Sequence, residues 1–141
     1  MAFPYGTSVS NEQAKIAAAP AVAEARKHGW TMAIAVVDIG GALVYFEKMD
    51  DTQTGSVEVA IAKARSAALF KRPTKAFQEA LAAGAEGLRV LALPNATPVE
   101  GGLPLVVEDC IVGAIGVSGG TSPQDAQCAQ AGVDALMKSA G

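Results

Sequence analysis

Two pairs of neighbouring apolar segments constrain the fold of this 141-residue chain more than any other feature. In the first pair, residues 30–37 and 42–49 flank the turn Asp38-Ile39-Gly40-Gly41, whose glycines accept positive φ. In the second pair, residues 103–107 and 110–117 flank Glu108-Asp109, a two-residue turn that requires positive φ. Segments joined by such short turns form β-hairpins. The sequence therefore predicts an antiparallel sheet flanked by helices, an α/β (α+β) fold.

The segment 30–37 is apolar at both alternating sets of positions, which is typical of a strand covered on both faces. Helical segments suited to that role lie on either side of it. The first is predicted to start near Ser10, which can form a capping box with Gln13, and to end at Gly29. Pro20 is expected to kink or split this helix.

Three further helices are predicted downstream. One covers residues 57–68 and stops before Pro73, and Thr74 is expected to cap the short helix that follows. The last helix is expected to begin with Ser122 as its cap and Pro123 at its first position. Residues 88–93 fit either a short strand or a turn of helix.

The composition indicates one domain, spanning residues 1–141, with a surplus of apolar surface. Hydrophobic residues make up 50% of the chain, charged residues 18%, and the mean hydropathy is +0.28. Because of this surplus, part of the apolar surface is expected to be buried between copies of the chain, in a homo-oligomer.

Charge and hydropathy exclude several classes of partner. The net charge is −3 and no basic stripe is present, so nucleic acid is not expected as a partner. We see no signal peptide and no apolar run long enough to span a membrane, and we expect a cytoplasmic protein. Cys110 and Cys128 do not form a CxxC motif or a Cys/His cluster, so inert packing is the favoured role for both, with a redox or ligand role as the alternative.

Several short motifs, taken in order, resemble the GlcG/HbpS family, which includes the C-terminal domain of PduO-type proteins. The resemblance runs from about Ala14 to Leu136. The motifs that carry it are Val36-Val37-Asp38, Gly40-Gly41, Leu43-Val44, Met49-Asp50, Lys63-Ala64, Ser66-Ala67, Gly101-Gly102-Leu103-Pro104, Gly113-Ala114-Ile115-Gly116-Val117-Ser118-Gly119, Asp125 and Ala131-Gly132. Two positions depart from the family pattern, because Lys48 stands where arginine is common and Asp109 where glycine usually makes the turn.

The resemblance implies a profilin- or PAS-like antiparallel sheet of about five strands, flanked by helices. It also implies homo-oligomers, an association with haem binding or degradation, and a place among genes for glycolate, glycerol or diol use. Fold follows from such a resemblance more securely than chemistry.

His28 is the candidate haem ligand because it is the single histidine of the chain. It stands at the end of the first predicted helix beside Arg26 and Lys27, where a surface or capping role is the alternative. Asp38 is expected either to cap its turn or to bind a substrate hydroxyl as a carboxylate at the mouth of a pocket.

Five more positions are ligand-binding candidates: Lys48, Asp50, Lys63, Gly119 and Gly120. Lys63 either extends its ammonium group into solvent or pairs with Asp38, Asp50 or an anionic ligand such as a haem propionate. Lys48 is a candidate as the counterpart of the family's arginine. The amides of Gly119 and Gly120, before the last helix, either form a tight turn or bind an anion.

Three functions remain open from the sequence. The first is an oligomeric protein that binds haem or another small ligand, with an accessory role in metabolism. The second is an enzyme that acts on a small oxygenated acid or aldehyde through Asp38 and Lys63. The third is a structural scaffold. No spacing typical of a metal site or a Ser-His-Asp triad is present.

Overall fold

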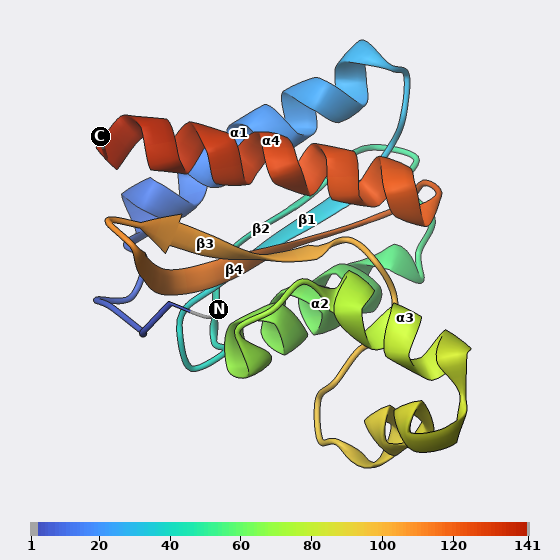
Figure 1. Ribbon diagram of the computed structural model, residues 1–141. Coiled ribbons are helices and arrows are strands. Elements are labelled where there is room, and N and C mark those ends of the chain that lie inside the picture. The colour runs from blue at the N-terminus through green and yellow to red at the C-terminus, as the bar shows by residue number, and fades with distance from the viewer. Residues whose placement is uncertain (1–2, 141) are drawn as a thin grey trace.

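The computed structural model describes residues 3–140, and the order of its helices and strands follows the sequence-based prediction (Figure 1). Its elements are α1 (Asn11–Lys27), β1 (Ala33–Val37), β2 (Leu43–Lys48), α2 (Ser56–Phe70), α3 (Thr74–Ala83), the 3₁₀ helix η1 (Ala85–Ala92), β3 (Gly102–Val107), β4 (Cys110–Ser118) and α4 (Ser122–Ala140).

The sheet is antiparallel throughout, with the strand order β2-β1-β4-β3. The two predicted hairpins, β1–β2 and β3–β4, lie side by side because β1 pairs with β4. Glu108 and Asp109 join the second hairpin with φ of 51° and 61°, so the predicted positive φ of this turn is confirmed.

The sheet has four strands among the described residues, whereas about five were expected. Residues 88–93, which fitted either a short strand or a turn of helix, form the C-terminal part of η1 and the residue after it, so the helical alternative holds. This segment packs against α3 and does not lie along a sheet edge. Val90 is buried there while Leu88 and Leu91 remain exposed, a pattern that a one-sided helical turn satisfies.

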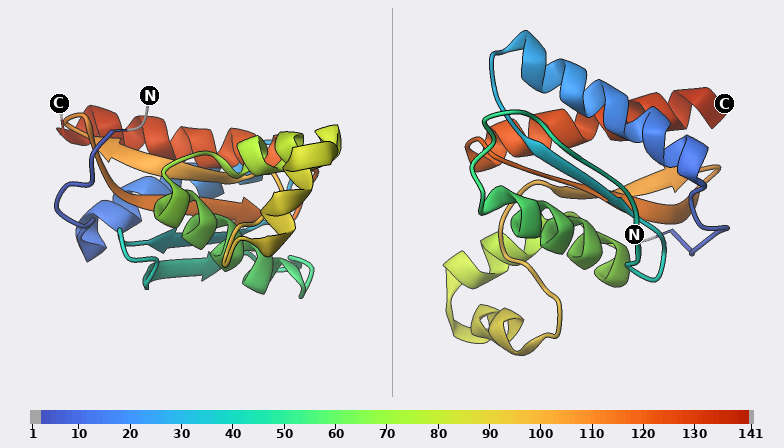
Figure 2. Two further views of the ribbon diagram at one scale, coloured as in Figure 1. Left: turned by 60° about the horizontal axis from the view of Figure 1, so that its bottom comes forward. Right: turned by 180° about the vertical axis from the view of Figure 1, so that it is seen from behind.

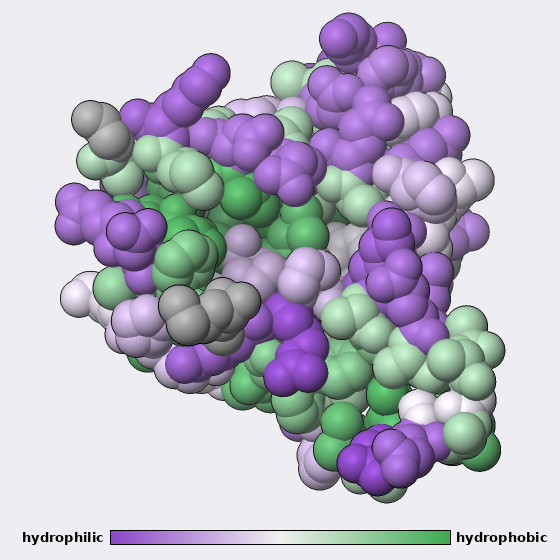
Figure 3. Space-filling view, viewed as in Figure 1, coloured by the Kyte–Doolittle hydropathy of each residue, from purple (hydrophilic) through white to green (hydrophobic). Residues whose placement is uncertain are grey.

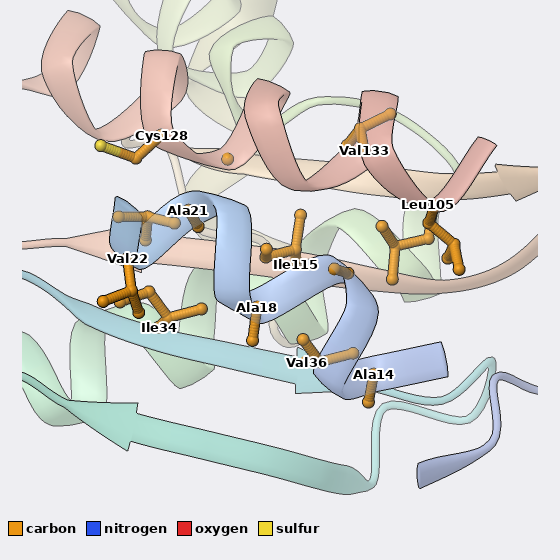
Figure 4. Close-up of a cluster of buried hydrophobic side chains, with 14 of the residues drawn as sticks. Ala14, Ala18, Ala21, Val22, Ile34, Val36, Leu105, Ile115, Cys128 and Val133 are labelled. Atoms are coloured by element: carbon orange, nitrogen blue, oxygen red, sulfur yellow. The ribbon is translucent and has the colours of Figure 1, made fainter. Parts of the chain in front are cut away.

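Helices cover both faces of the sheet, with α1 and α4 on one side and α2 on the other (Figure 2). The larger hydrophobic core lies between the sheet and the α1–α4 pair (Figure 4). The helices contribute mainly alanines to it, and the strands contribute larger side chains, including Ile34, Val36 and Ile115. Burying each of these larger side chains contributes about 1.5–3 kcal/mol.

The second core, beneath α2, consists almost entirely of alanine: Ala33, Ala35, Val37, Ala60, Ala64, Ala67, Ala68 and Ala114. A Cβ at Gly116 of β4 would overlap the carbonyl oxygen of Ala60. The backbone of α2 therefore lies unusually close to the sheet, and its inward side chains reach the sheet surface directly.

The start of α1 confirms the predicted capping box, since Ser10 and Gln13 each bond to the other's backbone amide. Pro20 does not split the helix, which continues unbroken to Lys27. The alanines of α1 are buried on both sides of Pro20, so packing compensates for the backbone hydrogen bond that proline lacks.

Within residues 3–140, no helix combines the length and apolarity needed to cross a membrane.

Candidate functional site

Lys63 lies at the centre of the most unusual polar arrangement in the molecule. Because α2 packs so closely on the sheet, the Lys63 side chain points into the interior and is 1% exposed. Its Nζ donates hydrogen bonds to Asp125 Oδ2 at 2.8 Å and to the Val117 carbonyl oxygen at 2.9 Å. The ammonium group therefore neither reaches solvent nor pairs with Asp38 or Asp50, the two partners considered from the sequence.

Asp125, in the first turn of α4, is the acidic partner of this buried ion pair and is 3% exposed. Its second oxygen, Oδ1, accepts a hydrogen bond from the Gly120 amide at 2.9 Å. Burial raises the pKa of the Asp125 carboxyl above its ordinary value of 3.8, although the contacts with Lys63 and the Gly120 amide act in the opposite direction.

The segment that leads into β3 closes over the ion pair. Gly101 has φ of +135°, and a Cβ at this position would lie 2.7 Å from Lys63 Nζ and 2.7 Å from the Val117 carbonyl oxygen. The next amide, of Gly102, donates to Thr74 Oγ1 at 2.9 Å. Thr74 therefore anchors this segment and does not cap α3, contrary to the prediction.

Asp38 lies at the other end of the sheet from the Lys63 ammonium group. In the β1–β4 register, Val37 pairs with Ala114, whereas Ile34 pairs with Val117, whose carbonyl binds Lys63. Asp38 Oδ1 accepts hydrogen bonds from the amides of Gly40 and Ala42, at 2.9 and 3.0 Å. Asp38 thus caps its turn, one of the two roles expected for it, and does not pair with Lys63.

Lys48 and Asp50 lie at the same end of the sheet as the ion pair but outside it. Lys48 pairs in register with Ala33, which pairs in turn with Ser118, the residue before Gly119. Both Lys48 and Asp50 are exposed. The fold thus brings Lys48, Asp50 and Gly119 to one end of the sheet, with the Lys63–Asp125 pair buried behind them.

The backbone amides at the start of α4 are largely used within the chain. The Gly120 amide binds Asp125, and the Thr121 amide binds Gln124 Oε1. The Gln124 backbone amide in turn donates a hydrogen bond to Thr121 Oγ1. The N-cap residue of α4 is therefore Thr121 and not the predicted Ser122. Gly120 therefore does not offer its amide to an external anion in this conformation.

His28 follows the last residue of α1 and is exposed. Its Nε2 lies 3.0 Å from Glu24 Oε2, and its ring stacks on Trp30 with 4.5 Å between centroids. Gln127 of α4 donates to the same Glu24 oxygen at 2.7 Å, so the cluster joins α1 to α4. The hydrogen bonds from Gln127 and His28 lower the pKa of Glu24 below its ordinary value of 4.5.

Three cavities indent the surface. Two of them, of about 510 and 460 Å³, adjoin the β3–β4 turn and share Glu108 and Ala140 as lining residues. Figure 3 shows apolar surface around this hollow, over β3. The third, of about 300 Å³, lies between α3 and η1. In the part of the chain that the structure describes, no three His, Cys, Asp or Glu side chains form a group that could hold a metal ion.

These features define a class of protein: a small α+β domain with a four-stranded antiparallel sheet, helices on both faces and a buried Lys–Asp pair between them. A family described as haem-degrading protein HbpS-like matches residues 9–134. The chain belongs to this HbpS-like family, as the sequence motifs predicted.

Named relatives agree with that assignment. Protein GlcG of Escherichia coli strain K12 is 40% identical over 110 residues, which cover 78% of this chain and 81% of GlcG. Among solved structures, a double mutant of Streptomyces reticuli HbpS is 30% identical with a TM-score of 0.85, covering 93% of this chain and 88% of HbpS. A haem complex of PduOC is 25% identical with a TM-score of 0.82, covering 92% and 95% of the two chains.

Sequence reasoning did not connect Lys63 with Asp125, although it singled out both residues. One sequence feature could have indicated the pair. A lysine on a helix face that is otherwise alanine-rich and buried needs a buried acidic partner. Asp125 was recognised as one of the motif positions shared with the family, and it lies 62 positions from Lys63 in the sequence.

Proposed function

We propose that this chain is a haem-binding protein that works as a homo-oligomer. The observation that carries the proposal is the similarity to a haem complex of PduOC, which extends over 92% of this chain, together with membership of a family described as haem-degrading. This proposal concerns binding and leaves haem turnover aside.

His28 is the axial ligand that we propose. It is the single histidine of the chain, its ring is accessible to solvent, and it lies at a surface shared by α1 and α4. Coordination through Nε2 requires Glu24 to release the ring, whereas coordination through Nδ1 leaves the Glu24 contact in place. Trp30, stacked on the imidazole, would hold the His28 ring in place and offer an aromatic surface to a bound haem.

A surface between copies of the chain is the proposed location of the macrocycle, because the hollows beside the β3–β4 turn and on the α3–η1 segment are open to solvent. The outward face of α2 supports self-association: Val59 and Leu69 are exposed there and Ala62 is half-buried between them. Exposed apolar side chains on a helix whose other face is already packed on the sheet favour a contact with another copy.

Hemin titration tests haem binding. The expected result is a Soret band that shifts and saturates, together with a rise in melting temperature that increases with hemin concentration. Native mass spectrometry of the same sample should show the mass of haem on an oligomer. Titration without any spectral change, in a sample that is oligomeric by mass, contradicts the proposal.

The role of His28 is tested separately with His28→Ala and the control Lys27→Ala, which changes the exposed neighbour. We expect the Soret maximum of the complex to move in His28→Ala and to stay in place in Lys27→Ala. An unchanged spectrum in His28→Ala excludes His28 as the axial ligand but leaves the titration result standing.

A further inference from the structure

The segment α3–η1 forms a lobe that projects from the rest of the molecule (Figures 1 and 2). The two helices touch at Gly87, where a Cβ would overlap the carbonyl oxygen of Ala80. Beside this contact lies the groove of about 300 Å³, which we call the lobe groove; it is lined by Arg72, Ala76, Phe77, Ala80, Glu86, Gly87, Arg89, Val90 and Leu93.

The floor of the lobe groove is apolar and well supported. Phe77 and Val90 are each only 4% exposed, so both are held by packing. The Phe77 ring also meets Phe70 edge to face, with 5.2 Å between the centroids. Because little of Phe77 and Val90 is accessible, the apolar surface open to a ligand is provided mainly by Ala76, Ala80 and Leu93, which line the same groove and are supported from below by the two buried side chains.

Two arginines lie at the rim of this floor, out of four in the whole chain. Arg72 is oriented by a hydrogen bond from Nε to the Phe70 carbonyl oxygen at 2.9 Å, and its guanidinium carbon lies 5.5 Å from the Phe77 ring centroid. Its terminal nitrogens make no hydrogen bond within residues 3–140. Arg72 is thus fixed through Nε, and the N–H groups of its two terminal nitrogens remain available to a ligand.

Arg89 is also without an acidic partner among the described residues, since no carboxylate oxygen approaches it within 4.0 Å. Glu86 lines the same groove but makes no ion pair with either arginine. The chain as a whole carries a net charge of −3, so two unpaired guanidinium groups beside one apolar floor are a local exception.

We infer that the lobe groove binds a small organic acid, whose carboxylate is held by Arg72 and Arg89 and whose apolar body lies against Ala80 and Leu93, above the packed floor. Guanidinium groups match carboxylates in shape and charge, and an apolar body matches the floor. The volume is at the lower end of ligand pockets, which favours a ligand much smaller than a haem macrocycle. The inference is therefore independent of the proposed haem binding.

Benzoate is the probe, because it combines a carboxylate with an aromatic ring. We would titrate it into the ¹⁵N-labelled full chain and follow the backbone amides. We expect saturable shifts concentrated on residues 72–93. Benzyl alcohol, which lacks the charge, and acetate, which lacks the ring, should each bind at least about threefold more weakly.

Charge variants of the rim provide the second test. The double variant Arg72→Gln/Arg89→Gln should weaken benzoate binding about three- to tenfold, whereas Arg26→Gln, an exposed arginine on α1, should not change it. Glu86→Gln should tighten binding, because it removes the negative charge from the rim. The amide spectrum of each variant confirms that it is folded.

Three results overturn the inference. They are benzoate shifts outside residues 72–93, equal binding by wild type and the double arginine variant, and inorganic phosphate binding as tightly as benzoate. The last result would define a simple anion site in which the apolar floor plays no part.

Discussion

Lys63 is the residue on which the interior polar structure depends. Its ammonium group is compensated by one carboxylate and one carbonyl oxygen, in a place where water does not reach. A buried ion pair of this kind adds little net stability compared with an apolar pair, but removing one member leaves the other charge buried and unpaired.

Replacing Lys63 with methionine should therefore cost about 3–5 kcal/mol of unfolding free energy, because Asp125 loses its countercharge. Urea denaturation measures the loss, and Lys75→Met, at an exposed position on α3, is the control that should change stability little.

The double variant Lys63→Met/Asp125→Asn should lose less than the sum of its two single variants, since the unpaired charge is gone. Additive losses, or a loss below 1 kcal/mol for Lys63→Met, would mean that the two side chains do not depend on each other.

Glu24 should make a pH-dependent contribution to the α1–α4 contact. Hydrogen bonds from Gln127 and His28 lower the pKa of Glu24 in the folded state. A lowered folded-state pKa gives stability that is present above the unfolded value of 4.5 and lost as pH falls through the folded value.

Gln127→Ala should raise the pKa of Glu24 toward 4.5, because Gln127 provides the largest lowering contribution. Carboxyl ¹³C NMR titration of Glu24 measures this directly, with Gln130→Ala on the same helix as the control. A Glu24 titration curve that is identical in wild type and Gln127→Ala would contradict the assignment.

At the scale of elements, the position of α2 determines where the Lys63 ammonium group lies in the interior. Its alanine-rich inward face and Gly116 of β4 bring the helix backbone onto the sheet, and Lys63 then reaches across to β4 and α4. β3 begins at Gly102, whose amide is held by Thr74, while the preceding Gly101 lies against the ion pair.

Two glycine substitutions at the ends of elements should differ in sign. Gly101→Ala places a side chain against Lys63 Nζ at φ of +135°, which costs roughly 1–3 kcal/mol from backbone conformation before any overlap is counted. Gly55→Ala, before α2 at φ of −62° and in open space, should stabilise by about 0.4–1 kcal/mol. Thermal or urea unfolding of both variants tests the contrast, and a neutral Gly101→Ala would refute the tight enclosure of the ion pair.

At the scale of the whole molecule, the sheet is covered on both faces, and large apolar side chains remain exposed on several elements, among them Val59 and Leu69 of α2. Exposed apolar side chains on a helix that is packed on its other side favour an interaction surface.

Val59→Glu/Leu69→Glu should dissociate the proposed oligomer to the 14.2 kDa protomer, because two charges would have to be buried in the interface. Sedimentation velocity measures the change. Ala23→Glu, exposed on α1, should leave the assembly intact. A wild-type chain that sediments as a protomer at high concentration would rule out the oligomer itself.

The sequence by itself determined the hairpins, the α1 capping box and the helical segments. These features depend on residues within a few positions of one another, as with Glu108-Asp109 or Ser10 and Gln13. The family resemblance also followed from local motifs in their order. Where local patterns were ambiguous, as at residues 88–93, the alternatives could not be separated without knowing which surface the segment packs against.

Only the tertiary structure decided the partners of the candidate site residues. Lys63 and Asp125 are 62 positions apart, and Thr74 and Gly102 are 28 apart, so no spacing rule joins them. The register of β1 with β4 separated Asp38 from Lys63, and the contact of α3 with η1 placed two arginines on one groove. Such contacts arise because packing brings distant segments together, and the desolvation that makes Lys63 require Asp125 exists only once the core has closed.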